Sequence, residues 1–137
     1  MRVVIDTNCL LASIPPKSVH AWLYQSFENE EFEWIVSNEI LTEYEEKIIE
    51  RYSKKTADIV LTLLTIAPNT TFSEPYYNWQ LIENDGDDNK FADLAIATNV
   101  DYLVTNDSDF NILKKISFPK VVVVSLNEFR EVIESLS

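Results

Sequence analysis

The stretch Arg2-Val3-Val4-Ile5-Asp6 sets the first expectation for the fold. Its run of β-branched residues predicts a buried strand over residues 2–5. Similar apolar segments return at Glu33–Val36, Tyr102–Val104 and Val121–Val124, with helical patterns between them. Strands that alternate with helices in this way are typical of a three-layer α/β/α domain with a mainly parallel central sheet.

The segments between the strands repeat apolar residues at helical spacing. Within Ser53–Ile66, the residues Ile59, Leu63 and Ile66 are in step at helical spacing and predict a helix. The run Val121–Val124 is apolar throughout, which predicts a central strand. The expected helices are Lys17–Glu28, the segment that Ser37 caps, Ser53–Ile66, Asp88–Thr98 and Leu126–Leu136, with a short strand at Thr70–Phe72 and a loop at Ser73–Asp87.

The composition is that of an acidic, folded, single domain. Of the 137 residues, 46% are hydrophobic, which excludes a disordered chain in spite of a formal net charge of −12. No repeat or linker divides the sequence, so we expect one domain over residues 1–137. The acidity argues against sequence-independent capture of nucleic acid, because phosphates would be repelled. It does not exclude a nucleic-acid enzyme, since a carboxylate site that holds metal would itself add negative charge.

Rare residue types exclude several kinds of site. One glycine cannot supply a Walker phosphate loop or a dinucleotide-binding loop, both of which need several. One cysteine and one histidine exclude a disulfide framework and a Cys/His zinc site. An acid as early as Asp6 does not fit a signal peptide, and no apolar run approaches the roughly 18 residues of a membrane span. We therefore expect a soluble, cytoplasmic protein with no membrane contact.

Acidic residues stand at the ends of predicted strands. Asp6 follows the first strand, and Asp107 follows the strand at Tyr102–Val104. The carboxyl ends of parallel strands meet where open α/β sheets bind ligands. Asp88 begins a helix, and Glu43 lies on the helix after the second strand. Four acids brought together there would form an oxygen-only pocket for Mg²⁺ or Mn²⁺, and metal-activated water would be the nucleophile.

Each of these acids also has an alternative interpretation. Asp6 could cap the turn that follows the strand, and Asp88 is a good helix N-cap by residue type. Glu43 could be one more exposed acid on an acidic helix, while Asp107 and Asp109 could form Asx turns. An aspartate at the end of a buried strand nevertheless needs a partner, so the joint arrangement is favoured over separate explanations.

Four motifs resemble those of the PIN domain, in the same order along the chain. The resemblance extends from Asp6 to the last strand and helix, and the order and spacing of the motifs are more specific than any single one. The run from Asp85 to Phe91 resembles a branch of toxin components of toxin–antitoxin pairs (VapC-like), although Gly86 stands where that branch usually has proline. The motifs are Asp6-Thr7-Asn8, Glu43 within Glu39-Ile40-Leu41-Thr42-Glu43-Tyr44, Asp88-Asn89-Lys90-Phe91, and Thr105-Asn106-Asp107-Ser108-Asp109-Phe110.

The resemblance implies a divalent-metal-dependent endoribonuclease that hydrolyses phosphodiester bonds of RNA with Mg²⁺ or Mn²⁺. It implies that the catalytic and metal-binding quartet is Asp6, Glu43, Asp88 and Asp107. By the same match, Asp109 is an accessory metal ligand.

The resemblance also implies supporting residues and partners. Asp93 stands where the branch often has glutamate and would help a second metal ion. Asn8 and Thr105 match small polar positions that would orient the ligand carboxylates by hydrogen bonds. Family members commonly form homodimers and are inhibited by a small antitoxin that inserts a segment near the site. We therefore expect a homodimer and a cognate antitoxin.

Other acidic α/β folds fit less well. A haloacid-dehalogenase-type phosphatase needs Asp-x-Asp after the first strand, and position 8 is Asn8. A response-regulator receiver needs an acid pair there and a lysine after the last strand, where Ser125 stands. A calcium loop around Gly86 would need acids at Leu81 and Ala92. The remaining alternative is a non-catalytic acidic module that docks a basic protein partner and is indifferent to Mn²⁺.

RNA contacts are the least defined part of the prediction. Lys47, Arg51 and Lys90 are candidates to hold phosphate beside the metal. Ordinary charge pairing on a helix surface explains Lys47 and Arg51 equally well. The aromatic residues at 76–79 could stack on unpaired bases, be buried, or cover a dimer face.

Overall fold

The structure, a computed structural model, describes residues 1–83 and 86–136 of the chain. Among these residues, five strands form one sheet in the order β3-β2-β1-β4-β5, and each neighbouring pair is parallel. The strands are β1 (Arg2–Ile5), β2 (Glu33–Val36), β3 (Thr70–Phe72), β4 (Tyr102–Val104) and β5 (Val123–Val124). The predicted α/β class with a parallel central sheet is confirmed.

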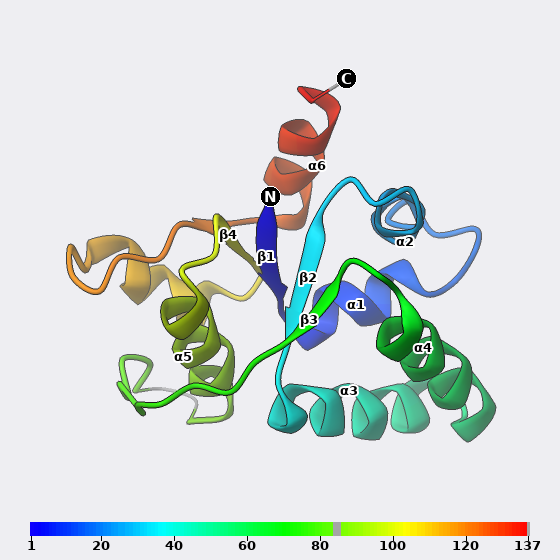
Figure 1. Cartoon of the computed structure of the whole chain (residues 1–137), viewed down its shortest axis with the longest axis horizontal. Coiled ribbons are helices and arrows are strands. Elements are labelled where there is room, and N and C mark those ends of the chain that lie inside the picture. The colour runs from blue at the N-terminus through cyan, green and yellow to red at the C-terminus, as the bar shows by residue number, and fades with distance from the viewer. Residues whose placement is uncertain (84–85, 137) are drawn as a thin grey trace.

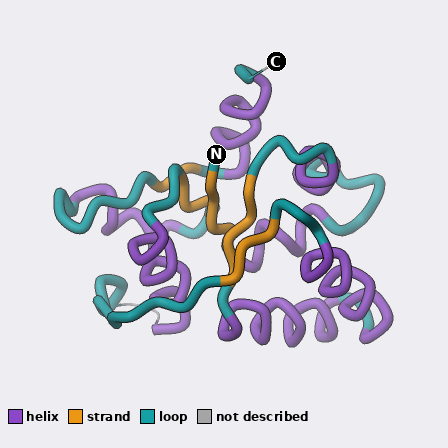
Figure 2. The backbone as a smooth tube through the Cα atoms, viewed as in Figure 1, coloured by secondary structure: helices purple, strands orange, loops and turns teal. Residues whose placement is uncertain are grey.

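Helices connect the strands and flank the sheet (Figure 2). In Figure 1, α5 lies on one side of β1 and β4, and α1, α2 and α4 lie on the other side. No helix within the described ranges is long and apolar enough to cross a membrane. The helices are α1 (Thr7–Ser13), α2 (Trp22–Glu28), α3 (Asn38–Arg51), α4 (Lys54–Ile66), α5 (Asn89–Thr98) and α6 (Leu126–Glu134), with 3₁₀ segments at Gly86–Asp88 and Ser108–Lys115.

The order of the strands reverses at β1. From β1 the chain continues to β2 and β3 on one side, and it then returns to β4 and β5 on the other. Ile5 lies opposite Val104 in the sheet, and the Asp6 N–H donates to the Val104 carbonyl at 2.9 Å. Open α/β sheets bind ligands in the crevice outside the carboxyl ends of the strands, at this kind of reversal. Asp6 and the residues that follow Val104 therefore lie at the switch point.

The core fixes β1 in the middle of the sheet. β1 is completely buried from Val3 to Ile5, as expected for a central parallel strand. Trp34 of β2 packs edge-on against Phe27, with ring centroids 5.1 Å apart. Phe129 of α6 packs edge-on against Phe32 at 5.2 Å. These aromatic contacts tie β2 and α6 into one core, so the carboxyl end of β1 has a defined position.

The prediction of a central strand at Val121–Val124 is wrong. Within that run, Val123–Val124 form β5, and β5 is an outer strand paired with β4. α6 and the segment Ser108–Lys115 contact it, so Val121 and Val124 are buried even at the edge. An apolar run indicates that the faces of a strand are covered, and here helical segments cover them.

The helix predicted at Ser53–Ile66 is present as α4, but the apolar residues that indicated it are not the ones it buries. α4 buries Ala57, Val60 and Leu64, whereas Ile59 and Ile66 are 52% and 71% exposed. Both sets repeat at helical spacing, so periodicity alone could not choose between them. Contacts of α4 with α3 and β3 select the first set, and an apolar stripe is left on the outer surface of α4.

Several boundaries differ by part of a turn or more. α2 begins at Trp22 rather than Lys17, because residues 15–21 form turns. α6 ends at Glu134. Residues 73–83 are irregular, as expected for a loop, and Asp85 of the sequence motif lies outside the described residues.

Candidate metal centre

Three carboxylates converge beside the switch point. One oxygen each from Asp88, Asp107 and Asp109 lies within 4.8 Å of the others. Asp88 is buried and stands directly before α5, but its side chain does not cap that helix. Asp107 Oδ1 accepts a hydrogen bond from the Asp109 N–H at 2.9 Å, which turns the chain into the segment Ser108–Lys115. This turn places the carboxylate of Asp109 next to that of Asp107.

Asp6 is joined to this group through a threonine. Asp6 is 4% exposed at the end of β1. Thr105 Oγ1 donates to Asp6 Oδ2 at 2.9 Å and accepts from the Asp107 N–H at 3.0 Å. One hydroxyl group therefore orients Asp6 and the backbone of Asp107 together.

The environment of Asp6 favours its protonated form. Burial raises the pKa of the Asp6 carboxyl, and the hydrogen bonds from Thr105 and the Thr7 backbone lower it. The negative charges of Asp107 and Glu43 raise it again, and the result is a pKa of about 6, against an ordinary value of 3.8. Carboxylates that repel one another in a buried place are a common sign of a cation site.

Glu43 reaches the site from α3. Ser37 Oγ accepts from the Ile40 N–H at 3.2 Å and caps the start of this helix. The hydroxyl of the fully buried Tyr44 donates to the carbonyl oxygen of Ile5. This bond ties α3 to the last residue of β1, so the neighbouring side chain of Glu43 lies beside Asp6.

Both carboxylate oxygens of Glu43 have partners. Thr7 Oγ1 donates to Glu43 Oε2. Lys90 Nζ lies 2.7 Å from Glu43 Oε1, and the two side chains are 13% and 14% exposed. Burial lowers the pKa of the Lys90 ammonium, but the hydrogen bond and charge of Glu43 outweigh that effect and raise it. Lys90 is therefore a charged ammonium group next to Glu43.

Two other predicted site residues lie outside this arrangement. Asp93 is buried, and its Oδ1 accepts from the Trp79 N–H at 3.1 Å. Asp93 thus faces the segment that follows β3 rather than the three converging carboxylates. Asn8 is exposed on α1, and among the described residues no hydrogen bond joins its side chain to Asp6 or Asp107.

Two of the candidate RNA contacts, Lys47 and Arg51, lie on the surface. Lys47 Nζ is 3.5 Å from Glu50 Oε2 on the exposed face of α3. The guanidinium group of Arg51 lies 5.9 Å from the ring centre of Tyr52. Of the aromatic residues at 76–79, Tyr76 is 95% exposed. Of the predicted basic contacts, Lys90 has an ion pair within the site.

Three contributions were not predicted from the sequence. The Tyr44 hydroxyl positions α3 through its hydrogen bond to the Ile5 carbonyl. Asn106 Oδ1 accepts from the Leu126 N–H at 2.9 Å and joins the end of β4 to α6. The ion pair of Lys90 with Glu43 spans two helices, so helical spacing within one segment could not reveal it.

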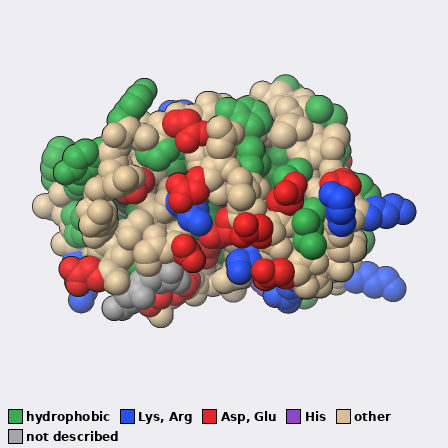
Figure 3. Space-filling model, turned by 90° about the horizontal axis from the view of Figure 1, so that it is seen from below, with side chains coloured by type: hydrophobic (Ala, Val, Ile, Leu, Met, Phe, Trp, Pro, Cys, Tyr) green, Lys and Arg blue, Asp and Glu red, His purple; other side chains and the backbone are tan. Residues whose placement is uncertain are grey.

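Seen from below, at the carboxyl ends of the strands, the molecule has acidic side chains near the middle of its face (Figure 3). Basic side chains lie among them and toward one end. The converging donors are carboxylate oxygens, which suit the hard cations Mg²⁺ and Mn²⁺. Burial is the main cause of the raised pKa of Asp6, and a cation among these carboxylates would offset the smaller contribution of the neighbouring negative charges. The residues therefore fit a divalent metal ion.

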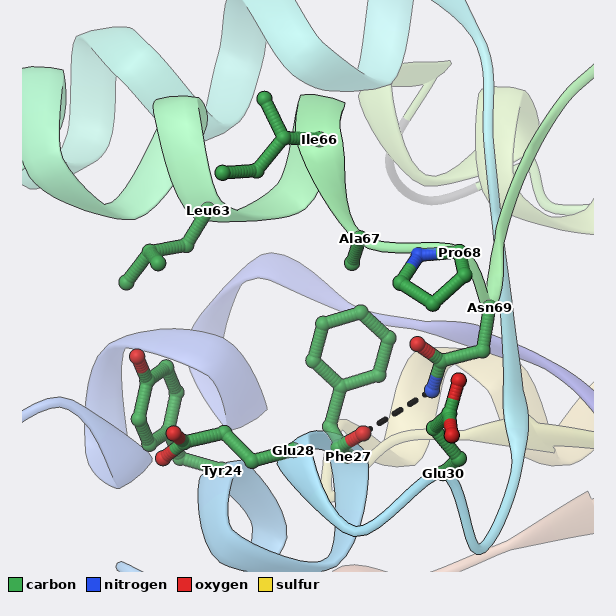
Figure 4. A pocket seen from close by; sticks show the side chains of 9 residues that line it. All are labelled: Tyr24, Phe27, Glu28, Glu30, Leu63, Ile66, Ala67, Pro68 and Asn69. Atoms are coloured by element: carbon green, nitrogen blue, oxygen red, sulfur yellow. Dashed lines mark hydrogen bonds between the residues drawn. The ribbon is translucent and has the colours of Figure 1, made fainter.

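A separate apolar hollow lies between α2 and the end of α4 (Figure 4). Its volume is about 390 Å³, and Phe27, Leu63 and Ile66 are among its lining residues. Asn69 Nδ2 donates to the Phe27 carbonyl at its edge. None of the converging carboxylates lines this hollow, so it is separate from the candidate metal centre. Its largely apolar lining is suited to apolar contact rather than to hydrolysis.

Comparison with known proteins agrees with this geometry. A protein-family model described as the PIN domain matches residues 2–109. Comparison with curated protein sequences gives no match.

Solved structures share the fold across most of the chain. VapBC2 from Rickettsia felis, bound to a DNA fragment from its promoter, has a TM-score of 0.64 at 19% identity, with 91% of this chain and 98% of that chain covered. VapC20 of Mycobacterium tuberculosis, a toxin that cleaves the sarcin–ricin loop, has a TM-score of 0.58 at 12% identity, covering 80% and 92%. FitAcB from Neisseria gonorrhoeae has a TM-score of 0.58 at 13% identity, covering 90% and 97%.

Proposed function

The chain belongs to the PIN-domain family, and from this premise we propose that it is a divalent-metal-dependent endoribonuclease. The observation that carries the proposal is the convergence of Asp88, Asp107 and Asp109 beside the buried Asp6, at the switch point of a parallel sheet. Carboxylates arranged in this way are suited to phosphodiester hydrolysis with Mg²⁺ or Mn²⁺.

The residues divide the work by position. Asp88, Asp107 and Asp109 would hold the metal ion, which supplies a water of lowered pKa and charge stabilisation at the phosphate. Thr105 holds the Asp6 carboxylate in a fixed orientation by its 2.9 Å hydrogen bond. With a pKa of about 6 before metal binds, Asp6 is suited to accept the proton of the attacking water. Glu43, held in place by Thr7 and paired with Lys90, borders the site on the α3 side.

We also propose that the chain is the toxin of a toxin–antitoxin pair, acts on RNA in the cytoplasm and forms a homodimer. The shared fold with VapC20, a toxin that cleaves the sarcin–ricin loop, supports this assignment. A protein partner is consistent with the apolar hollow between α2 and α4 and with the exposed Ile59 and Ile66.

The test is cleavage of a mixed, end-labelled pool of single-stranded RNA with Mn²⁺, with Mg²⁺ and with chelator. Wild-type protein is compared with Asp6→Asn, which removes a charge at nearly constant shape. Asp58→Asn is the matched control, because Asp58 is an exposed acid on α4. We expect metal-dependent cleavage by the wild type and the control, and none by Asp6→Asn. Cleavage by Asp6→Asn at the wild-type rate would contradict the assignment of the site. A wild-type protein that neither cleaves RNA nor responds to Mn²⁺ would favour the non-catalytic module that docks a basic protein partner.

A further inference from the structure

We propose that Lys90 is a built-in cation that takes the place of a second metal ion beside Glu43. The inference rests on the proposed metal site and goes beyond it, because it states how many divalent ions the acidic residues accept. With Lys90 present, the site takes a single divalent ion at Asp88, Asp107 and Asp109.

The position of the ammonium group is the first argument. Lys90 Nζ lies 2.7 Å from Glu43 Oε1. A divalent ion bound to a carboxylate oxygen would lie about 2.1 Å from it. Thr7 holds the other oxygen, Oε2. A metal ion on Glu43 would therefore have to share an oxygen atom with Lys90 or Thr7, and at Oε1 it would meet the like charge of the Lys90 ammonium group.

Burial is the second argument. The side chains of Lys90 and Glu43 are 13% and 14% exposed, so water screens their attraction much less than it screens an exposed pair. Removing one member of the pair would leave the other as a poorly solvated charge, and this would destabilise the folded state. The fold therefore keeps Lys90 at Glu43 instead of leaving that carboxylate for a mobile cation.

The distribution of charge is the third argument. The negative groups that act on Lys90 are Glu43, Asp87 and Glu39. The three converging carboxylates lie toward the end of β4, and no lysine or arginine in the described residues forms an ion pair with Asp107 or Asp109. One end of α5 thus provides a ligand, Asp88, for one part of the site and a counter-ion for the other.

The experiment counts bound ions instead of measuring cleavage. Mn²⁺ is titrated into purified protein, and the number of ions per chain is obtained by calorimetry and from the loss of the free Mn²⁺ signal in electron paramagnetic resonance. We expect Lys90→Gln to bind one ion more than the wild type, because Glu43 then lacks its cation. Lys90→Arg keeps the charge and should bind the wild-type number.

Two further variants keep the result interpretable. Lys90→Met retains the length of the apolar stem and replaces Lys90→Gln if that variant does not fold, as judged by circular dichroism. Lys54→Gln is the matched control, since Lys54 pairs with Asp58 on the surface of α4, and it should bind the wild-type number.

The outcomes separate the two proposals. An unchanged number of ions in both Lys90→Gln and Lys90→Met overturns the role of Lys90, and so does an additional ion in Lys90→Arg. Wild-type protein that binds no Mn²⁺ contradicts the metal site of the proposed function. Even then, the expected difference of one ion between the wild type and Lys90→Gln still decides the role of Lys90.

Discussion

Carboxylates on the two sides of β1 have different partners. On the α3 side, Glu43 is enclosed by a lysine and a threonine. On the β4 side, the carboxylates of Asp107 and Asp109 lie close to each other and to that of Asp88. Asp107 Oδ1 accepts a hydrogen bond from the backbone N–H of Asp109. The first side is neutralised by the chain itself, whereas the second concentrates negative charge.

This difference shows that a count of acids does not measure metal-binding capacity. A carboxylate with an ammonium partner at 2.7 Å has its charge compensated in the folded state. Asp107 and Asp109, which form no ion pair with a lysine or arginine among the described residues, gain more from an added cation. The contrast between the Lys90-paired side and the β4 side can be tested by substitutions of decreasing expected effect.

The largest effect is expected from Asp107→Asn. This substitution removes one of the three converging carboxylates, so we expect Mn²⁺ affinity and RNA cleavage to fall by at least about 100-fold, which is the upper end for residues that only support a metal ligand. Glu43→Gln should reduce Mn²⁺ affinity by no more than about tenfold, because Lys90 already compensates Glu43. Calorimetry and initial cleavage rates measure the two effects. An equal loss of Mn²⁺ affinity in both variants would remove the distinction between the two sides.

The next effect concerns Asp6, which lies between the two sides. Because the folded state raises the pKa of Asp6 from 3.8 to about 6, it holds the proton more tightly than the unfolded state does. The resulting stabilisation of metal-free protein is complete below about pH 4 and is lost as the pH rises through 6. Its full size is about 3 kcal/mol.

Urea unfolding in chelator between pH 4 and pH 7 measures this dependence. Asp6→Asn cannot ionise at this position, so its unfolding free energy should vary less with pH, and it should be the more stable protein at pH 7. An identical pH dependence in the two proteins would show that Asp6 carries no raised pKa.

A smaller effect is expected from Tyr44→Phe. The substitution removes the hydrogen bond to the Ile5 carbonyl and leaves that buried group without the hydroxyl, at a loss of about 1–2 kcal/mol in unfolding free energy. It should also slow cleavage by loosening Glu43, while Mn²⁺ affinity at the β4 side stays unchanged. Tyr52→Phe is the matched control, because Tyr52 donates to the Leu11 carbonyl at the far end of α3. Comparable slowing of cleavage in Tyr52→Phe would mean that general stability, and not the position of Glu43, is responsible.

The smallest effect is expected at the surface. Replacing Lys47 and Arg51 with glutamine should weaken RNA binding a few-fold and lower the salt slope of log Kd by about one to two, if these residues touch phosphate. Binding is measured with the cleavage-deficient Asp6→Asn background at several salt concentrations. An unaltered slope would show that Lys47 and Arg51 do not contact RNA phosphate, so that Lys47 serves only in its surface ion pair with Glu50.

The sequence was most informative where one short segment decides its own structure. The apolar run of β1 predicted a buried strand, and Ser37 predicted the start of α3, because each depends on neighbouring residues. The positions of Asp6 and Asp107 could also be anticipated, since the carboxyl ends of parallel strands share one edge of the sheet.

The sequence was least informative where distant elements choose among equal options. α4 carries two apolar stripes, and only its packing on α3 and β3 determines which one is buried. Asp93 turned toward the Trp79 N–H, a contact set by the path of an irregular loop. The pair of Lys90 and Glu43 depends on the relative placement of α3 and α5, which no local pattern contains.

The hydrogen bond between Thr105 and Asp6 joins residues that are 99 positions apart. During translation, β1 leaves the ribosome well before its neighbour β4 and the carboxylates at Asp107 and Asp109. A nascent chain that stops short of these residues has an incomplete sheet and an incomplete acidic site. The strand order thus delays completion of the sheet and of the acidic site until the residues up to Asp109 have been made.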